Sequence, residues 1–185
     1  MNLSEKIPAV ILNGFLGSGK TTLFRNLLAQ SKKKNIPVCA IVNDMSELDV
    51  DGELLGNTDI VEENNSILES IHSCVLSSKK GIKKLDKAIQ KLLLNHDPEL
   101  IIIETSGSCH PMPLIEYFKN HSQVELSGLF TLVDSLMLAH DYKYGESLVP
   151  KMRNNLVNGK RDTVNLLVEQ IMFCSHLILT KGDRI

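Results

Sequence analysis

Gly14-Phe15-Leu16-Gly17-Ser18-Gly19-Lys20-Thr21-Thr22 is the stretch that decides the fold, because it fits the phosphate-binding pattern G-x-x-x-x-G-K-[ST]. An apolar run at 8–13 (PAVILN) precedes it, and residues 20–34 follow with helical spacing of their apolar side chains. The glycines allow the backbone to pass close to phosphate oxygens. The N–H groups of the loop and of the helix N-terminus would point at the anion. This strand–loop–helix context predicts a P-loop NTPase.

Within this loop, Lys20 is expected to reach the β- and γ-phosphates, and the Thr21 hydroxyl is expected to bind Mg²⁺. The pattern indicates a nucleoside triphosphate and does not say which one. A glycine-rich turn without a ligand is the alternative, which the flanking strand and helix disfavour. The residues expected to contact the nucleotide here are Gly14, Gly17, Ser18, Gly19, Lys20, Thr21 and Thr22.

Outward from the loop, short apolar runs alternate with longer amphipathic segments. Further strands are expected at 36–42, 100–104, 126–133 and 176–179, and further helices at 81–96, 113–120 and 163–173. This order predicts an α/β fold with a mainly parallel sheet and helices on both faces. Two polar stretches interrupt it: 44–78 is expected to form loops and a short helix, and 139–160 a mobile connection.

Ligands of such sheets bind beyond the carboxyl ends of the strands, and polar motifs follow the expected strands there. Glu104-Thr105-Ser106-Gly107 follows the strand at 100–104. Glu104 would hold Mg²⁺ through water or orient the attacking water, and Gly107 would let the backbone approach the γ-phosphate. The alternative is a surface glutamate followed by a turn. Asp134 either belongs to this site or caps a helix that begins at Ser135.

Thr180-Lys181-Gly182-Asp183 follows the last expected strand. The Asp183 carboxylate is able to accept hydrogen bonds from N1–H and the exocyclic amine of guanine, whereas adenine would leave it unpaired. The stem of Lys181 would pack along the base. A solvated turn is the alternative.

Composition excludes several classes of protein. The chain has 185 residues, of which 43% are hydrophobic and 23% charged, and a formal net charge of −2. This balance argues against nucleic acid as a partner, because binders of phosphate backbones usually carry a basic excess. No apolar run approaches the roughly 20 residues that span a bilayer. The first residues lack the layout of a signal peptide, so a cytoplasmic location without membrane contact is expected.

Taken together and in this order, these motifs resemble the CobW-type P-loop GTPases, a family of cobalamin-synthesis-like proteins and zinc-linked metallochaperones. The similarity extends over nearly the whole chain and includes VNDMSELDVDGEL at 42–54, IIIETSG at 101–107 and VNLLVEQIMFCSHLILTKGD at 164–183. The resemblance implies GTP and Mg²⁺ binding, slow GTP hydrolysis with Lys20 and Glu104 as catalytic residues, and transfer of zinc or cobalt to a client protein. Thr180 stands where the family normally has Asn.

A transition-metal site is the least defined implication of the resemblance. The family carries a CxCC motif after its second-strand region, whereas this chain has the single thiol of Cys74 there. One thiol does not make a tight zinc site, which takes about four ligands. Cys74 and Glu47 are the candidate ligands for a mixed site. Its further candidates are His72, Cys109, His110, Asp44 and Asp51. The alternative is that these are unrelated loop residues.

Two other functions stay open from the sequence. One is a nucleotide-dependent switch that binds a protein partner without a metal. The other is a P-loop kinase of small molecules, which the scarcity of arginines near the phosphate loop disfavours. The oligomeric state is undetermined.

The guanine motif ends at Asp183, and only Arg184 and Ile185 follow it. P-loop GTPases normally continue into a further sheet element. Residues 1–185 are therefore expected to be a C-terminally truncated GTPase domain.

Overall fold

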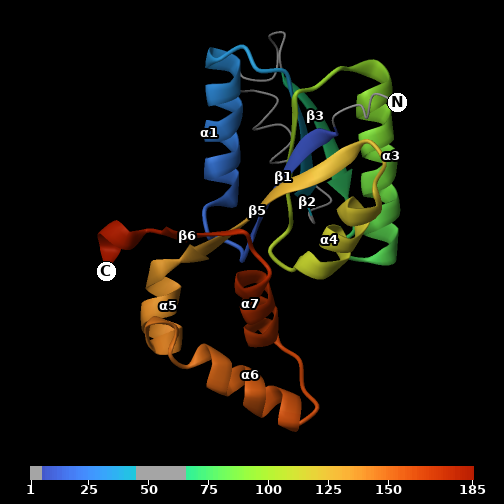
Figure 1. The fold of residues 1–185 in the computed structure, drawn as a ribbon. Helices are drawn as coiled ribbons and strands as arrows, with labels where there is room; N and C mark the ends of the chain where they lie inside the picture. Colours follow the sequence, from blue (N-terminus) through green and yellow to red (C-terminus); the bar gives the residue numbers. More distant parts are fainter. Residues whose placement is uncertain (1–5, 45–65) are drawn as a thin grey trace.

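A six-stranded sheet, parallel throughout, organises the chain, with strand order β3-β2-β4-β1-β5-β6 (Figure 1). The computed structural model describes residues 6–44 and 66–185. The strands are β1 (Ile7–Gly14), β2 (Val38–Asp44), β3 (Ser66–His72), β4 (Leu100–Glu104), β5 (Val124–Asp134) and β6 (His176–Thr180). The predicted parallel α/β fold is confirmed.

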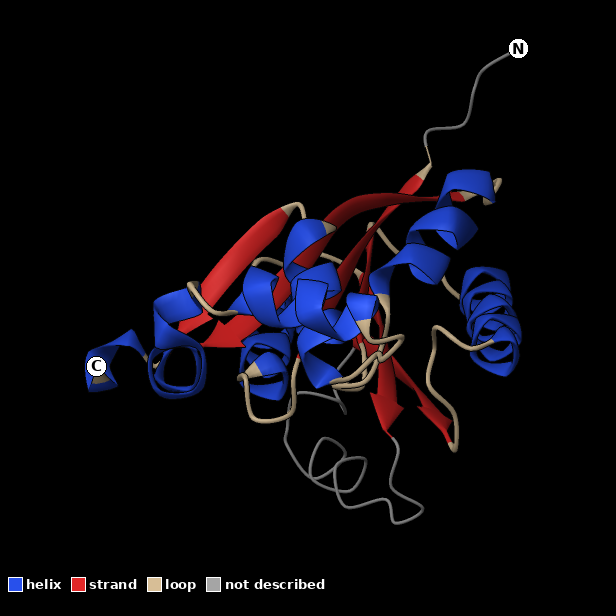
Figure 2. Ribbon diagram, turned by 90° about the horizontal axis from the view of Figure 1, so that it is seen from below, coloured by secondary structure: helices blue, strands red, loops and turns tan. Residues whose placement is uncertain are grey.

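Helices cover both faces of the sheet, as Figures 1 and 2 show. The helices are α1 (Lys20–Lys33), α3 (Lys79–Asn95), α4 (Pro111–Asn120), α5 (Ser135–Tyr142), α6 (Leu148–Val157) and α7 (Thr163–Met172), with 3₁₀ turns η1 (Lys143–Gly145) and η2 (Gly182–Arg184). No helix among the described residues is long and apolar enough to cross a membrane.

Alternation along the central strands divides the core into two layers. Ala9 and Ile11 of β1 face the cluster formed with α3 and α4, whereas Leu12 faces the cluster formed with α1. Successive side chains of a strand point to opposite faces, so strands buried on both sides are apolar throughout. A third cluster joins α5, α6 and α7 to the end of β5. The four interior strands of the sheet, β2, β4, β1 and β5, are all among the strands expected from apolar runs.

Two expectations for the polar stretches were wrong. Between 44 and 78 the structure contains β3, in which Ile71 is buried and Ile67 and Leu68 are half-buried. An edge strand contacts only one neighbour and needs no continuous apolar run, so the apolar-run criterion overlooks it. Between 139 and 160 the structure contains α6, which Leu148 and Met152 pack against the third cluster. Packing outweighs the weak helix propensity of its asparagines.

Gly81, in the first turn of α3, lies against the loop that follows β3. A Cβ atom at this position would come within 2.1 Å of the Val75 carbonyl oxygen and 2.6 Å of Leu76 Cα. Backbone atoms do not yield as a side-chain end would. Glycine is therefore required here, because the helix backbone and the loop backbone approach each other closely.

Replacing Gly81 with alanine is expected to lower the free energy of unfolding by about 1–3 kcal/mol, because the methyl group overpacks the loop. Helix propensity alone predicts the opposite sign, a gain of about 1 kcal/mol. Urea unfolding measures the difference. Lys83→Ala, on an exposed position of the same helix, is the control and should change little. A stabilised Gly81→Ala protein would contradict the prediction.

Candidate functional site

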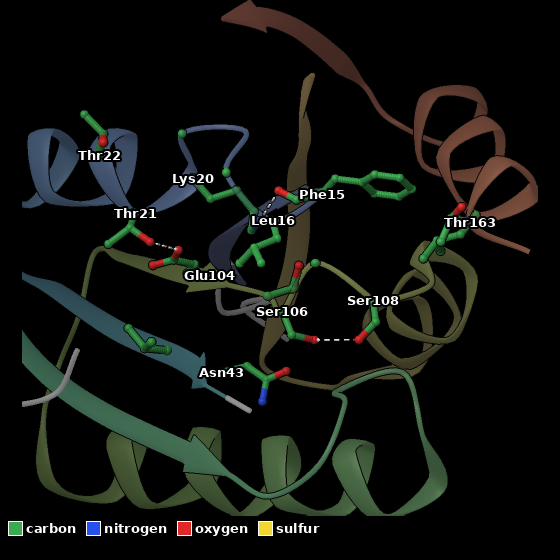
Figure 3. Close-up of a pocket in the computed structure, with 16 residues that line it drawn as sticks. Phe15, Leu16, Lys20, Thr21, Thr22, Asn43, Glu104, Ser106, Ser108 and Thr163 are labelled. Atoms are coloured by element: carbon green, nitrogen blue, oxygen red, sulfur yellow. Dashed lines mark hydrogen bonds between the residues drawn. The ribbon is translucent and has the colours of Figure 1, made fainter. Parts of the chain in front are cut away.

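A cavity of about 700 Å³ lies beyond the carboxyl ends of β1 and β4 (Figure 3). Four segments contribute to it: the phosphate loop, the end of β2, the loop after β4 and the start of α7. Its lining includes Phe15, Leu16, Lys20, Thr21, Asn43, Glu104, Ser106, Ser108, Thr163 and Leu166. The polar ends of adjacent parallel strands thus meet at one place, as expected for a ligand site of this fold.

The phosphate loop reverses the chain between β1 and α1 through three glycines with positive φ. The φ angles of Gly14, Gly17 and Gly19 are 131°, 75° and 94°. At Gly14 a side chain is excluded sterically as well, because a Cβ atom would lie 2.2 Å from the Leu132 carbonyl oxygen. This geometry needs glycine.

Lys20 is held inside the loop. Its Nζ donates hydrogen bonds to the carbonyl oxygens of Gly14 and Phe15, both at 2.8 Å, and the residue is only 7% exposed. Burial lowers the pKa of this ammonium group from its ordinary 10.5, and the nearby Glu104 carboxylate partly offsets the shift. The charge is therefore placed at the centre of the loop and is poorly hydrated, a state that favours pairing with an anion.

Thr21 and Glu104 meet across the cavity although 83 positions separate them in the sequence. The Thr21 hydroxyl donates to Glu104 Oε1 at 2.5 Å (Figure 3). Glu104 is 6% exposed. Hydroxyl and carboxylate oxygens are the ligand types that Mg²⁺ takes beside nucleotide phosphates, so the donor set fits this ion.

Gly107 brings the loop after β4 against the phosphate loop. A Cβ atom there would lie 2.7 Å from the Leu16 backbone nitrogen. The Ser106 and Ser108 hydroxyls lie 3.5 Å apart at the rim of the cavity (Figure 3). Of the other loop residues, Thr22 lines the cavity, whereas Ser18 is buried beside it.

The residues expected to select the base, Thr180, Lys181 and Asp183, are not among those that line this cavity. Thr180 Oγ1 donates to the Ser18 carbonyl oxygen at 2.9 Å and lies 3.3 Å from the Val133 carbonyl oxygen. A threonine hydroxyl therefore ties β6 directly to the phosphate loop. Asp183 is well exposed, with Arg184 Nε 3.9 Å from its carboxylate.

Asp134 is a helix cap and an ion-pair partner together. Its Oδ1 accepts a hydrogen bond from the Leu136 N–H at the start of α5, and its Oδ2 lies 2.5 Å from Lys181 Nζ. The hydrogen bond with Lys181 is the main reason that the pKa of the Asp134 carboxyl lies below its usual value. This pair fixes the head of Lys181 at the start of α5.

The candidate metal ligands do not converge within the described residues. Cys74 and Cys109 are buried, and Cys74 packs in the apolar cluster beneath α3. No group of three or more His, Cys, Asp or Glu side chains placed to hold a metal occurs in residues 6–44 and 66–185. Glu47 and Asp51 lie outside the described residues, as does the side chain of Asp44. His110 instead pairs with Glu169 at 2.8 Å.

Sequence reasoning overlooked several residues around the cavity. Asn13, the last residue of the first apolar run, is fully buried and receives hydrogen bonds from Gly14 and Thr105. Gln170 of α7 is equally buried. It lies outside the apolar stripe of its helix, where a side chain is normally solvated. For Asn13, a polar residue at the end of a buried strand was a signal in the sequence that could have indicated a role at the site. For Gln170 the sequence offered no such signal.

This fold and this loop define the class of P-loop nucleotide-binding domains. Residues 8–185 match the family model described as CobW/HypB/UreG, nucleotide-binding domain, and the chain belongs to this family. The resemblance noted from the motifs is thus confirmed.

Individual relatives agree with this assignment. The chain is 30% identical to zinc-regulated GTPase metalloprotein activator 1 of Dictyostelium discoideum, over 97% of this chain and 40% of the relative. It is 31% identical to the zinc chaperone CobW of a Sinorhizobium species, over 97% of this chain and 52% of the relative. The chain thus spans about half or less of these relatives.

Among solved structures, FlhF complexed with GMPPNP and Mg²⁺ superimposes with a TM-score of 0.53. The sequence identity is 16%, and the match covers 98% of this chain and 58% of that chain. This likeness supports the fold.

Nucleotide affinity is expected to fall as the pH rises through the lowered pKa of Lys20. Phosphate stabilises the ammonium form, so binding raises this pKa again and takes up a proton in the alkaline range. Calorimetric titration of GTP in buffers of different ionisation enthalpy would measure that uptake. Lys20→Met should abolish it and weaken binding about 10- to 100-fold, as for a lost charged hydrogen bond. If the affinity for GTP does not change with pH in the alkaline range, the prediction is wrong.

Proposed function

We propose that this chain binds and hydrolyses GTP with Mg²⁺, as the nucleotide-binding part of a protein that delivers a transition metal to a client protein. The hydrogen bond between Thr21 and Glu104 beside the buried Lys20 ammonium carries the proposal. It joins the phosphate loop to the carboxylate that follows β4. The family match and the GTPase and zinc chaperone names of the relatives support it.

In the proposed reaction, Lys20 exchanges the two carbonyl oxygens for oxygens of the β- and γ-phosphates. Its charge offsets the negative charge that develops during transfer of the γ-phosphoryl group to water. Thr21 and Glu104 would hold Mg²⁺. The bound ion would neutralise part of the negative charge of the phosphates. Because Glu104 faces the Thr21 hydroxyl, its orientation favours the Mg²⁺ role over that of orienting water.

The base site is proposed to consist of Thr180, Lys181 and Asp183. The lysine is oriented by Asp134, and Thr180 ties the strand end to Ser18. The contact of Thr180 with Ser18 of the phosphate loop supports this proposal. Asp183 would then accept hydrogen bonds from guanine.

GTP and GDP should bind at least tenfold more tightly than ATP in the presence of Mg²⁺, since adenine leaves the Asp183 carboxylate unpaired. Asp183→Asn should remove most of this preference, and calorimetric titration measures it. Glu125→Gln is the matched control, because it converts an exposed carboxylate at the opposite end of the sheet to an amide. Equal affinities for GTP and ATP in the unaltered chain would refute the role of Asp183.

The metal part of the proposal rests on the relatives, since the described residues do not form a zinc site by themselves. Cys74 and Glu47 are its proposed ligands, and a cytoplasmic location and a client protein belong to the same proposal. The alternative is a switch that binds nucleotide and a protein partner only.

Zinc titration with and without GTP separates these two functions. About one zinc ion per chain is expected for the metal-delivery function, and Cys74→Ala should weaken its binding. Cys39→Ala, a second buried thiol of the same core cluster, is the control and should leave zinc binding unchanged. If the unaltered chain holds no zinc in any nucleotide state, the metal function fails and the switch is favoured.

A further inference from the structure

Gln170 is a fully buried polar residue of α7 whose side chain reaches the nucleotide site instead of the surrounding apolar cluster. Its Nε2 lies 3.0 Å from the Cys109 carbonyl oxygen, 3.3 Å from the Gly107 carbonyl oxygen and 3.2 Å from Asn13 Oδ1. Its backbone carbonyl accepts a hydrogen bond of 2.8 Å from Thr131 of β5. The residue is therefore attached at both ends, to the sheet and to the loop after β4.

Asn13 extends this contact to the phosphate loop. Its Oδ1 accepts hydrogen bonds from the Gly14 N–H at 2.8 Å and from the Thr105 hydroxyl at 3.0 Å, besides that from Gln170. Gly14 is the first residue of the phosphate loop. One buried network thus connects α7, the start of the phosphate loop and the loop after β4, which includes the turn at 106–109.

The hydrogen bonds of the Gln170 amide indicate that this side chain positions neighbouring carbonyl groups and does not only fill space. Its two N–H bonds serve three oxygens, and its Oε1 has no hydrogen-bond partner among the described residues. A buried acceptor without a partner costs free energy, whereas Met would fill a similar volume without that cost. The amide therefore contributes through the carbonyl groups that it holds.

The same face of α7 borders the cavity. Thr163 and Leu166 line the cavity, and Gln170 follows them at helical spacing of three and four residues. Two further contacts attach this helix to the site: Phe15 of the phosphate loop packs against its apolar cluster, and Glu169 pairs with His110. Figure 3 shows Phe15 pointing toward Thr163.

We propose that Gln170 is a positioning residue for the γ-phosphate, which holds the turn at 106–109 in register with the phosphate loop. The inference rests on the proposed binding of GTP, in which Gly107 of this turn approaches the γ-phosphate. GDP lacks that group and does not contact the turn. Loss of the Gln170 donor therefore weakens binding of the triphosphate and slows its hydrolysis while binding of GDP is kept.

Gln170→Met in the full chain tests the proposal by calorimetric titration with GMPPNP and GDP. Affinity for GMPPNP is expected to fall about tenfold, as for the loss of one buried hydrogen bond, and affinity for GDP to stay within about twofold. The kcat for GTP should fall as well. Leu167→Ala is the control: this fully buried residue packs in the cluster of α5, α6 and α7, so its loss lowers Tm without changing the ratio of the two affinities.

Gln170→Glu supplies a second readout that a purely structural role would not move. Its carboxylate cannot donate, but its protonated form restores one donor at nearly the same place. Burial raises the pKa of such a carboxyl. Lowering the pH from about 8 to about 5.5 should therefore protonate it and restore the preference for GMPPNP over GDP. The unaltered chain should show no such recovery. This pH profile decides the question if the Met variant does not fold.

An unchanged ratio of GMPPNP to GDP affinity in Gln170→Met, with unchanged kcat, would overturn the proposal. So would a Gln170→Glu profile that does not depend on pH. If the unaltered chain binds neither nucleotide, the proposed GTP binding itself fails. This outcome differs from failure of the Gln170 proposal, because it is seen in the chain without any substitution.

Discussion

The pairing of β1 with its two neighbours is the constraint on which the rest of the site depends. In the parallel register, Leu12 lies opposite Glu104 of β4, and Gly14 lies opposite Leu132 of β5. The phosphate loop therefore begins beside the carboxylate that ends β4. A sheet with β1 at another position would separate these groups, however well the loop itself matched the phosphate-binding pattern.

Burial of polar groups is the second organising feature of the site. Asn13, Lys20, Glu104 and Gln170 all lie within or beneath the loops at the carboxyl edge of the sheet, and each is less than 8% exposed. Such groups are costly to bury without partners, and their hydrogen bonds define the geometry closely. The bonds of Asn13 and Gln170 join the phosphate loop, the loop after β4 and α7. Rigid placement of the loops is what a preorganised phosphate site needs.

The sequence predicted elements where local pattern and tertiary environment agree. The apolar runs that became β1, β4 and β5 are buried on both faces of the sheet, which is the environment that such runs imply. β3 was missed because it lies at the edge, and α6 because packing of Leu148, not propensity, stabilises it. Asp134 was left between two roles, and the structure shows it capping α5 while pairing with Lys181.

By itself the sequence determined the phosphate loop, because glycines at defined spacings, a lysine and a hydroxyl are a local requirement of backbone shape and charge. It also indicated β1, β2, β4 and β5 through their unbroken apolar character. The equally apolar β6 lies at the edge of the sheet, so the position of a strand within the sheet was not determined by that character. Only the tertiary structure decided that Glu104 meets Thr21 and that Gln170 faces the turn at 106–109. The physical reason is that these contacts join residues 83 and 63 positions apart, whose approach depends on strand order and helix packing, which no local pattern encodes.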